Sequence, residues 1–63
     1  MQTNALYNLL CQLVQEQKSL WRINNHYLAE CANDSEKTFW EAMIKDKEKH
    51  IKDLMKLAKP HFS

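Results

Sequence analysis

The chain of 63 residues contains no glycine, and its one proline, Pro60, stands close to the carboxyl end. Glycine and proline disfavour the helix more than any other residues, so nothing before Pro60 forces a long helix to break. A chain of this length forms at most one small domain. We therefore expect a single all-α domain that spans residues 1–63.

The first half of the chain repeats apolar residues at alternating spacings of three and four. This pattern predicts an amphipathic helix from about residue 4 to about residue 32. Val14, Trp21 and Leu28 widen its apolar face at intervals of seven, which is typical of a multi-helix bundle. The residues of the repeat are Leu6, Leu10, Leu13, Gln17, Leu20, Asn24, Tyr27 and Cys31.

A second repeat of the same kind predicts a helix from about residue 35 to about residue 59. Between the two helices, residues 33–35 (Asn-Asp-Ser) are the one turn signal. We expect Asn33 to close the first helix in a left-handed conformation, and Asp34 or Ser35 to cap the second. The short connection makes the helices an antiparallel two-helix hairpin. The second repeat consists of Trp40, Ile44, Lys47, Ile51, Leu54 and Ala58, with Met43, His50 and Leu57 beside it.

Two wide apolar faces on so short a chain require a further stabilising element. Disulfides, metals and oligomerisation are the usual ones. Cys11 and Cys31 cannot bridge within the chain, since one helix would hold them about 30 Å apart. We therefore expect two hairpins to dimerise into a four-helix bundle. The expected oligomer core consists of Leu10, Leu13, Leu20, Trp21, Tyr27, Trp40, Met43, Ile44, Ile51 and Leu54.

Three short segments carry a resemblance to a known family. Residues 28–30 (Leu-Ala-Glu) precede a polar turn, residues 39–41 (Phe-Trp-Glu) follow it, and residues 46–51 (Asp-Lys-Glu-Lys-His-Ile) come later. Together they resemble the helical hairpin of the ferritin-like and rubrerythrin-related proteins. The resemblance implies that the chain is one half of a ferritin-like bundle.

The resemblance also implies a degenerate metal site. In that family a Glu of the first helix faces a Glu-x-x-His of the second helix. The corresponding positions here are Gln17, Lys47 and His50, so only the histidine is kept. An amide and an ammonium are poor replacements for carboxylate ligands, because a charged lysine has no lone pair to donate.

Four polar residues interrupt the apolar stripes at similar distances from the turn. They are Gln17, Asn24, Lys47 and His50. One interpretation is a hydrogen-bonded layer that fixes the register and the oligomeric state of the bundle. A second is a pocket for a small molecule or a metal. In a third, Lys47 lies at the edge and extends its ammonium into water.

The preferred functional hypothesis is a non-enzymatic module for homo-oligomeric assembly or interaction, with no catalytic residue and no cofactor. The alternative is a protein that binds iron or another divalent metal, or a redox protein, with a site assembled between subunits. In that case His50 would be a ligand together with Asp46, Glu48 or Glu16.

Charge and hydropathy narrow the range of partners. Nine basic and eight acidic residues leave a net charge of +1, which is too small to indicate nucleic acid or an anionic membrane as a partner. No apolar run approaches the ~20 residues of a membrane span, and the amino end lacks the pattern of a signal peptide. We expect a cytoplasmic protein that pairs with itself or with an unidentified protein.

Overall fold

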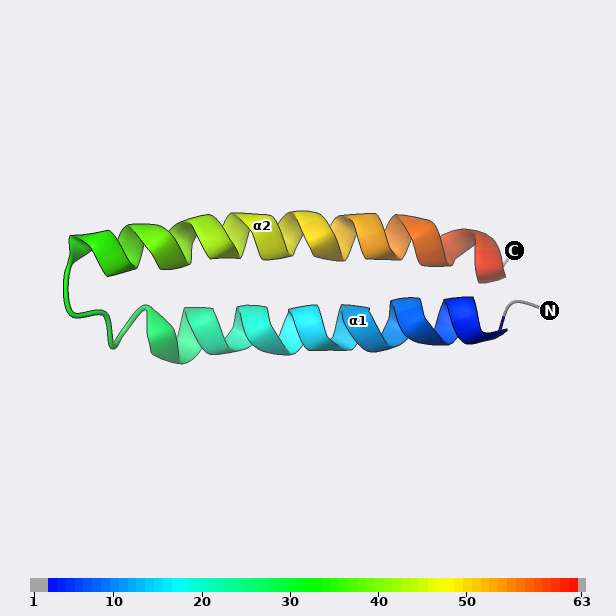
Figure 1. The fold of residues 1–63 in the computed structure, drawn as a ribbon, viewed down its shortest axis with the longest axis horizontal. Coiled ribbons are helices and arrows are strands. Elements are labelled where there is room, and N and C mark those ends of the chain that lie inside the picture. The colour runs from blue at the N-terminus through cyan, green and yellow to red at the C-terminus, as the bar shows by residue number, and fades with distance from the viewer. Residues whose placement is uncertain (1–2, 63) are drawn as a thin grey trace.

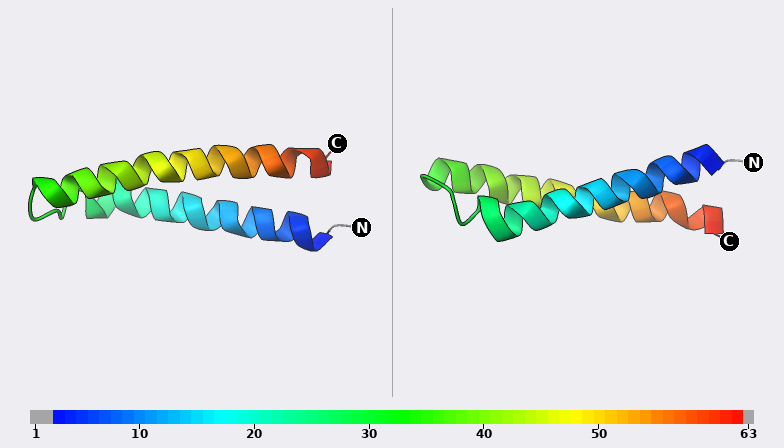
Figure 2. Two further views of the ribbon diagram at one scale, coloured as in Figure 1. Left: turned by 45° about the horizontal axis from the view of Figure 1, so that its top comes forward. Right: turned by 90° about the horizontal axis from the view of Figure 1, so that it is seen from below.

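The computed structural model describes residues 3–62, which form an antiparallel hairpin of two helices (Figure 1). Helix α1 (Thr3–Arg22) continues into a π-helix, η1 (Ile23–Tyr27), and helix α2 (Asp34–Ala58) continues into a short 3₁₀-helix, η2 (Lys59–Phe62). The hairpin measures 49 × 15 × 13 Å, and its two helices cross at a shallow angle (Figure 2). The expected all-α hairpin is confirmed.

The contact between α1 and α2 uses one apolar stripe from each helix. On α2 the stripe is the expected one, since Trp40, Met43, Ile44, Ile51 and Leu54 are half-buried against α1. On the first helical segment, α1 with η1, the large side chains that are half-buried or buried at this contact are Leu6, Leu9, Leu13, Glu16, Leu20 and Ile23. Leu6, Leu13 and Leu20 are residues of the expected stripe, but the structure places the other three contacts one residue earlier than the repeat in the sequence suggests.

This shift moves several expected contact residues to the surface. Gln17 and Asn24 are exposed and lie outside the contact between the helices, where Glu16 and Ile23 take their places. Leu10, Trp21 and Tyr27 are also exposed on the hairpin. Apolar residues occupy two adjacent stripes of α1, and a step of one residue turns a helix by about 100°, so the spacing alone did not decide which stripe meets α2.

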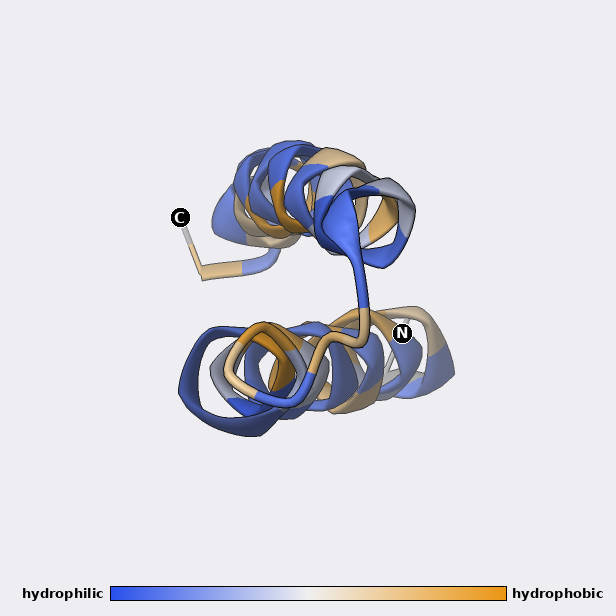
Figure 3. Cartoon of the chain, turned by 90° about the vertical axis from the view of Figure 1, so that its left-hand side faces the viewer, coloured by the Kyte–Doolittle hydropathy of each residue, from blue (hydrophilic) through white to orange (hydrophobic). Residues whose placement is uncertain are grey.

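The buried core is small. Among residues 4–62, Ile23 and Ala58 are the only apolar residues that are fully buried, and Glu16 is the only buried polar residue. Hydrophobic and hydrophilic segments alternate along both helices, so neither helix is apolar all round (Figure 3). The hairpin alone buries little apolar surface.

The first helical segment ends at Tyr27, earlier than the expected residue 32. In η1 the backbone N–H of Leu28 donates to the carbonyl of Ile23 at 3.0 Å, a bond that spans five residues. The side-chain amide of Asn25 donates to the carbonyl of Trp21 at 2.8 Å. This local bond competes with regular helical bonding, and the chain then leaves the helix.

Helix α2 begins with a reciprocal cap. Asn33 is extended, with φ −161° and ψ 175°, and its side chain accepts a bond from the N–H of Glu36 at 2.9 Å. The carboxylate of Glu36 accepts in turn from the N–H of Ala32 at 2.9 Å. The expected left-handed role of Asn33 is wrong, because residues 3–62 contain no positive φ. Asn33 caps α2, and Asp34 and Ser35 lie in its first turn.

Two aromatic rings join the helices at the turn end of the hairpin, and a third packs against one of them within α2. The rings of Tyr27 and Trp40 lie 4.8 Å apart between centroids and join the end of η1 to α2. Phe39 contacts Trp40 edge-on, with 5.1 Å between the ring centroids. Trp40 is therefore the residue that ties the two helices together next to the turn.

We predict that Trp40→Ala lowers the free energy of unfolding by about 3 kcal/mol, the usual loss for truncating a large packed aromatic. Urea denaturation followed by circular dichroism measures the loss. Phe39→Ala is the matched control, because Phe39 is an exposed aromatic, and it should cost less than about 1 kcal/mol. Equal losses in the two variants would contradict this account of the turn end.

Candidate functional site

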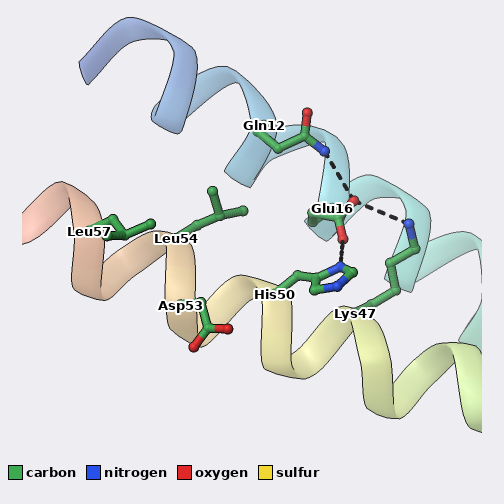
Figure 4. Close-up of a pocket in the computed structure, with 7 residues that line it drawn as sticks. All are labelled: Gln12, Glu16, Lys47, His50, Asp53, Leu54 and Leu57. Atoms are coloured by element: carbon green, nitrogen blue, oxygen red, sulfur yellow. Dashed lines mark hydrogen bonds and ion pairs between the residues drawn. The ribbon is translucent and has the colours of Figure 1, made fainter. Parts of the chain in front are cut away.

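A buried carboxylate joins the two helices near the middle of the hairpin. Glu16 of α1 accepts a bond from Lys47 Nζ at 3.1 Å on Oε2 and one from His50 Nδ1 at 2.8 Å on Oε1 (Figure 4). The side-chain amide of Gln12 donates to Oε2 at 3.2 Å. The Glu16 side chain is 8% exposed. We call Gln12, Glu16, Lys47 and His50 the Glu16 cluster.

Helical spacing brings these four side chains together. Gln12 and Glu16 lie four residues apart on α1, and Lys47 and His50 lie three apart on α2, so each pair shares one face of its helix. Lys47 lays its apolar stem in the helix contact and is 18% exposed, whereas the His50 side chain is 56% exposed. The cluster is thus shielded from solvent at Lys47 and open to solvent at His50.

The hydrogen bonds define the protonation of the histidine ring. An ionised carboxylate only accepts hydrogen bonds, so Nδ1 of His50 carries the proton in its bond to Glu16. The other ring nitrogen, Nε2, is then free to accept a bond when the ring is neutral. This is the arrangement in which a carboxylate orients a histidine.

The same contacts stabilise the charge of Glu16. The bond from His50, followed by the bond and the positive charge of Lys47, holds the pKa of Glu16 below its ordinary value. Burial acts in the opposite direction, because it disfavours the charged form. The hairpin is only 15 × 13 Å in cross-section, so water stays near and the contacts outweigh the burial.

A pocket of about 340 Å³ opens beside the cluster. The Glu16 cluster forms its polar end, and Leu54 and Leu57 form an apolar wall (Figure 4). Asp53 lies at the rim, where its bond from Lys49 at 2.9 Å lowers its pKa. The pocket therefore combines a neutralised polar end with an apolar wall.

The structure brings together part of the expected polar layer. Lys47 and His50 meet one carboxylate, as their shared face indicated, but the residue that faces them is Glu16 and not Gln17. Gln17 and Asn24 point away from this contact, and their place in a layer between two hairpins stays a prediction. The spacing of Leu9, Leu13, Leu20 and Ile23 was the signal that could have placed Glu16.

The four weak metal-ligand candidates are only partly together. His50 and Glu16 are in contact, while Asp46 and Glu48 are exposed on α2. Within residues 3–62, no three His, Cys, Asp or Glu side chains gather closely enough to hold a metal ion. At the cluster itself, the Lys47 ammonium supplies the positive charge beside the Glu16 carboxylate.

Comparison with known proteins found no matching family model, no matching curated protein and no matching solved structure. The ferritin-like resemblance therefore stays a prediction. In the described part of the chain, no helix has the length and apolar character needed to cross a membrane.

We predict that Glu16 makes stability depend on acid pH. Its folded-state pKa is lowered, so its contribution is fully present above the unfolded pKa of about 4.3 and is lost as the pH falls through the lower folded value. Glu16→Gln should lower the free energy of unfolding by about 1–3 kcal/mol at pH 7, because Lys47 and His50 lose their anion. Chemical denaturation between pH 7 and pH 2.5 measures the difference.

The difference between Glu16→Gln and the parent should shrink to near zero at the acid end. Asp53→Asn is the control, because Asp53 also has a lowered pKa but is exposed, and it should leave the stability nearly unchanged. A parent and a Glu16→Gln variant with the same pH profile would show that the cluster does not contribute.

Proposed function

We propose that the hairpin is a non-enzymatic self-association module, which pairs with a second copy to form a four-helix bundle. The observation that carries this proposal is a column of exposed apolar residues on α1. Tyr7 is 66% exposed and Trp21 58% exposed, and Leu10 and Val14 lie between them. These residues recur at helical spacing, so they form one stripe beside the stripe that meets α2.

The size of the core supports the same proposal. Ile23 and Ala58 are the fully buried apolar residues of the described chain, and two helices with so small a core are marginally stable at best. Large aromatic residues left in water on such a hairpin are typical of an association surface. A second copy of the chain would remove them from water.

The Glu16 cluster suits a structural role in this module. Every member of the cluster bonds to Glu16, so sliding one helix along the other would leave a buried charge without its partner. A buried polar contact of this kind fixes register in helical bundles. We therefore assign the cluster to alignment of the hairpin and not to catalysis.

A ferritin-like ancestry and a cytoplasmic location belong to the same proposal. A reducing compartment suits the chain, because Cys11 and Cys31 are both free thiols. The partner that this surface fits best is a second copy, and an unidentified protein with a matching apolar helix is the other candidate.

The second candidate function is a divalent-metal site, favoured by the contact of His50 with Glu16. A carboxylate does face the histidine, so Lys47 alone separates the cluster from two carboxylates and a histidine. Elemental analysis of the purified protein tests this function directly. A stoichiometric divalent metal would support it over the assembly module.

We predict that the hairpin is at least a dimer at micromolar concentration. Light scattering coupled to size exclusion measures the mass, and circular dichroism on dilution should show loss of helix as the dimer separates. Val14→Glu should shift the protein toward the monomer. Asn8→Glu, an exposed change elsewhere on α1, is the matched control and should not. A fully helical monomer at all concentrations would refute the proposal.

We also predict that Lys47→Glu creates a metal-binding cluster. The variant would place two carboxylates and His50 together, and mutual repulsion of the carboxylates should destabilise it without metal. Thermal melts should show a gain of stability with manganese or ferrous iron. Lys47→Gln removes the cation without adding a ligand, so it should show no such gain. Equal responses of the two variants would contradict the prediction.

A further inference from the structure

The exposed column of α1 continues onto α2 and forms what we call the open face. Tyr7, Val14 and Trp21 recur at intervals of seven on α1, and so do Glu41, Glu48 and Met55 on α2. Each set of three therefore lies along one side of its helix, and all six residues are exposed. Leu10 lines one hollow together with Tyr7 and Val14 and a second hollow together with Met55, so the two columns lie on the same side of the hairpin.

The hollow on the open face is mostly apolar, with Lys56 and Lys59 as its polar lining residues. It has a volume of about 530 Å³, and its apolar lining is formed by Leu10, Leu13, Met55, Ala58 and Phe62. It lies at the end of the hairpin where the two chain termini are found (Figure 1). Trp21 lies on the same side of α1 but toward the turn; it is 58% exposed, and its ring packs edge-on against His26.

The contacts of the Glu16 cluster show which residues of α1 and α2 lie opposite each other along the hairpin. Glu16 bonds to Lys47 and His50, so Val14 stands level with about residue 50 of α2. From Val14, Trp21 lies about 10 Å toward the turn, and Tyr7 lies about 10 Å toward the hollow. The tryptophan and the hollow are thus placed at similar distances on opposite sides of Val14.

We infer that a second copy packs on the open face with α1 antiparallel to the partner's α1, about a two-fold axis beside Val14. The inference rests on the proposed function and specifies its interface. The axis carries Trp21 of each copy to the level of the other copy's hollow, so two tryptophans fill two hollows. An interface of this kind is self-complementary, as two-fold symmetry requires.

The charges of α2 agree with this axis. The axis passes level with about residue 50 of α2, so Glu48 lies two residues before it and Lys52 two residues after it. The same rotation therefore packs α2 against the α2 of the other copy, with each Glu48 facing a Lys52. Glu41 lies nine residues before residue 50 and Lys59 nine residues after it, so the rotation also places each Glu41 opposite a Lys59 of the other copy. In the alternative dimer, the turns of both copies would lie at the same end. There α1 of one copy would face α2 of the other, and Trp21 would meet the column of Glu41 and Glu48.

Mixing two charge variants tests the α2 contact. Glu48→Lys alone and Lys52→Glu alone should each dimerise more weakly than the parent, because like charges then face each other. Mixed together, they should form heterodimers in preference to either homodimer, since opposite charges meet again. Native mass spectrometry measures the species, and a statistical mixture would overturn the proposed axis.

Distance measurement between spin labels tests the orientation. The full chain with Cys11→Ser and Cys31→Ser, labelled through Ser35→Cys at the start of α2, carries one label near each turn. The antiparallel dimer should give a separation of about 45 Å at the helical rise. Turns at the same end would give less than about 30 Å, because packed helices lie 8–10 Å apart, and that result would overturn the inference.

The third measurement is the contribution of Trp21. Trp21→Ala should raise the Kd of the dimer roughly 30-fold or more, as expected for a tryptophan anchor in a pocket. Phe39→Ala is the control, because Phe39 is an aromatic of similar exposure outside the open face, and it should change the Kd by less than about threefold. Equal effects would overturn the role of Trp21. A dimer with short label distances refutes this interface alone, whereas a monomer refutes the proposed function as well.

Discussion

One buried carboxylate links the two helices of the hairpin, and in the proposed module it fixes their register. Glu16 is bonded at once by Lys47 and His50 of the facing helix and by Gln12 of its own helix. Apolar packing between two leucine-rich stripes tolerates sliding, because one leucine resembles the next. A buried charge does not tolerate it, because each displaced position leaves an ion without its partners. Together with the Tyr27–Trp40 contact near the turn, this contact relates the positions of residues on the two helices.

The sequence predicted the elements of the fold better than their orientation. The absence of glycine and the three-four spacing predicted two antiparallel helices, and the structure has them. The rotation of α1 was not predictable from spacing, because Leu6, Leu13 and Leu20 belong equally well to a stripe with Leu10 or to one with Leu9 and Ile23. Only pairing with α2 decides between them, and pairing is a tertiary effect. The same ambiguity affected Glu16, which the sequence offered only as a weak candidate metal ligand while Gln17 was placed opposite Lys47.

The turn shows a second limit of local reasoning. Asn33 was correctly placed near the turn, but a short amide can close the helix before it or cap the helix after it. The outcome was decided by Glu36, whose carboxylate returns to the N–H of Ala32 and completes a reciprocal cap. On the other side, the amide of Asn25 bonds to Trp21 within the last helical turns and accompanies the π-helix. Both the cap and the π-helix depend on side-chain hydrogen bonds, and composition alone does not show which of the possible bonds forms.

The arrangement of polar and apolar groups in the hairpin is the reverse of that in a self-sufficient domain. Its most strongly bonded charges lie inside, at Glu16, while Tyr7 and Trp21 lie outside in water. An internal charge cluster adds specificity and little net stability, because desolvation offsets much of its attraction. The apolar surface that could stabilise the fold is on the open face, where only another molecule can cover it. A division of this kind agrees with the proposed pairing, in which alignment would come from within the hairpin and stability from a second copy.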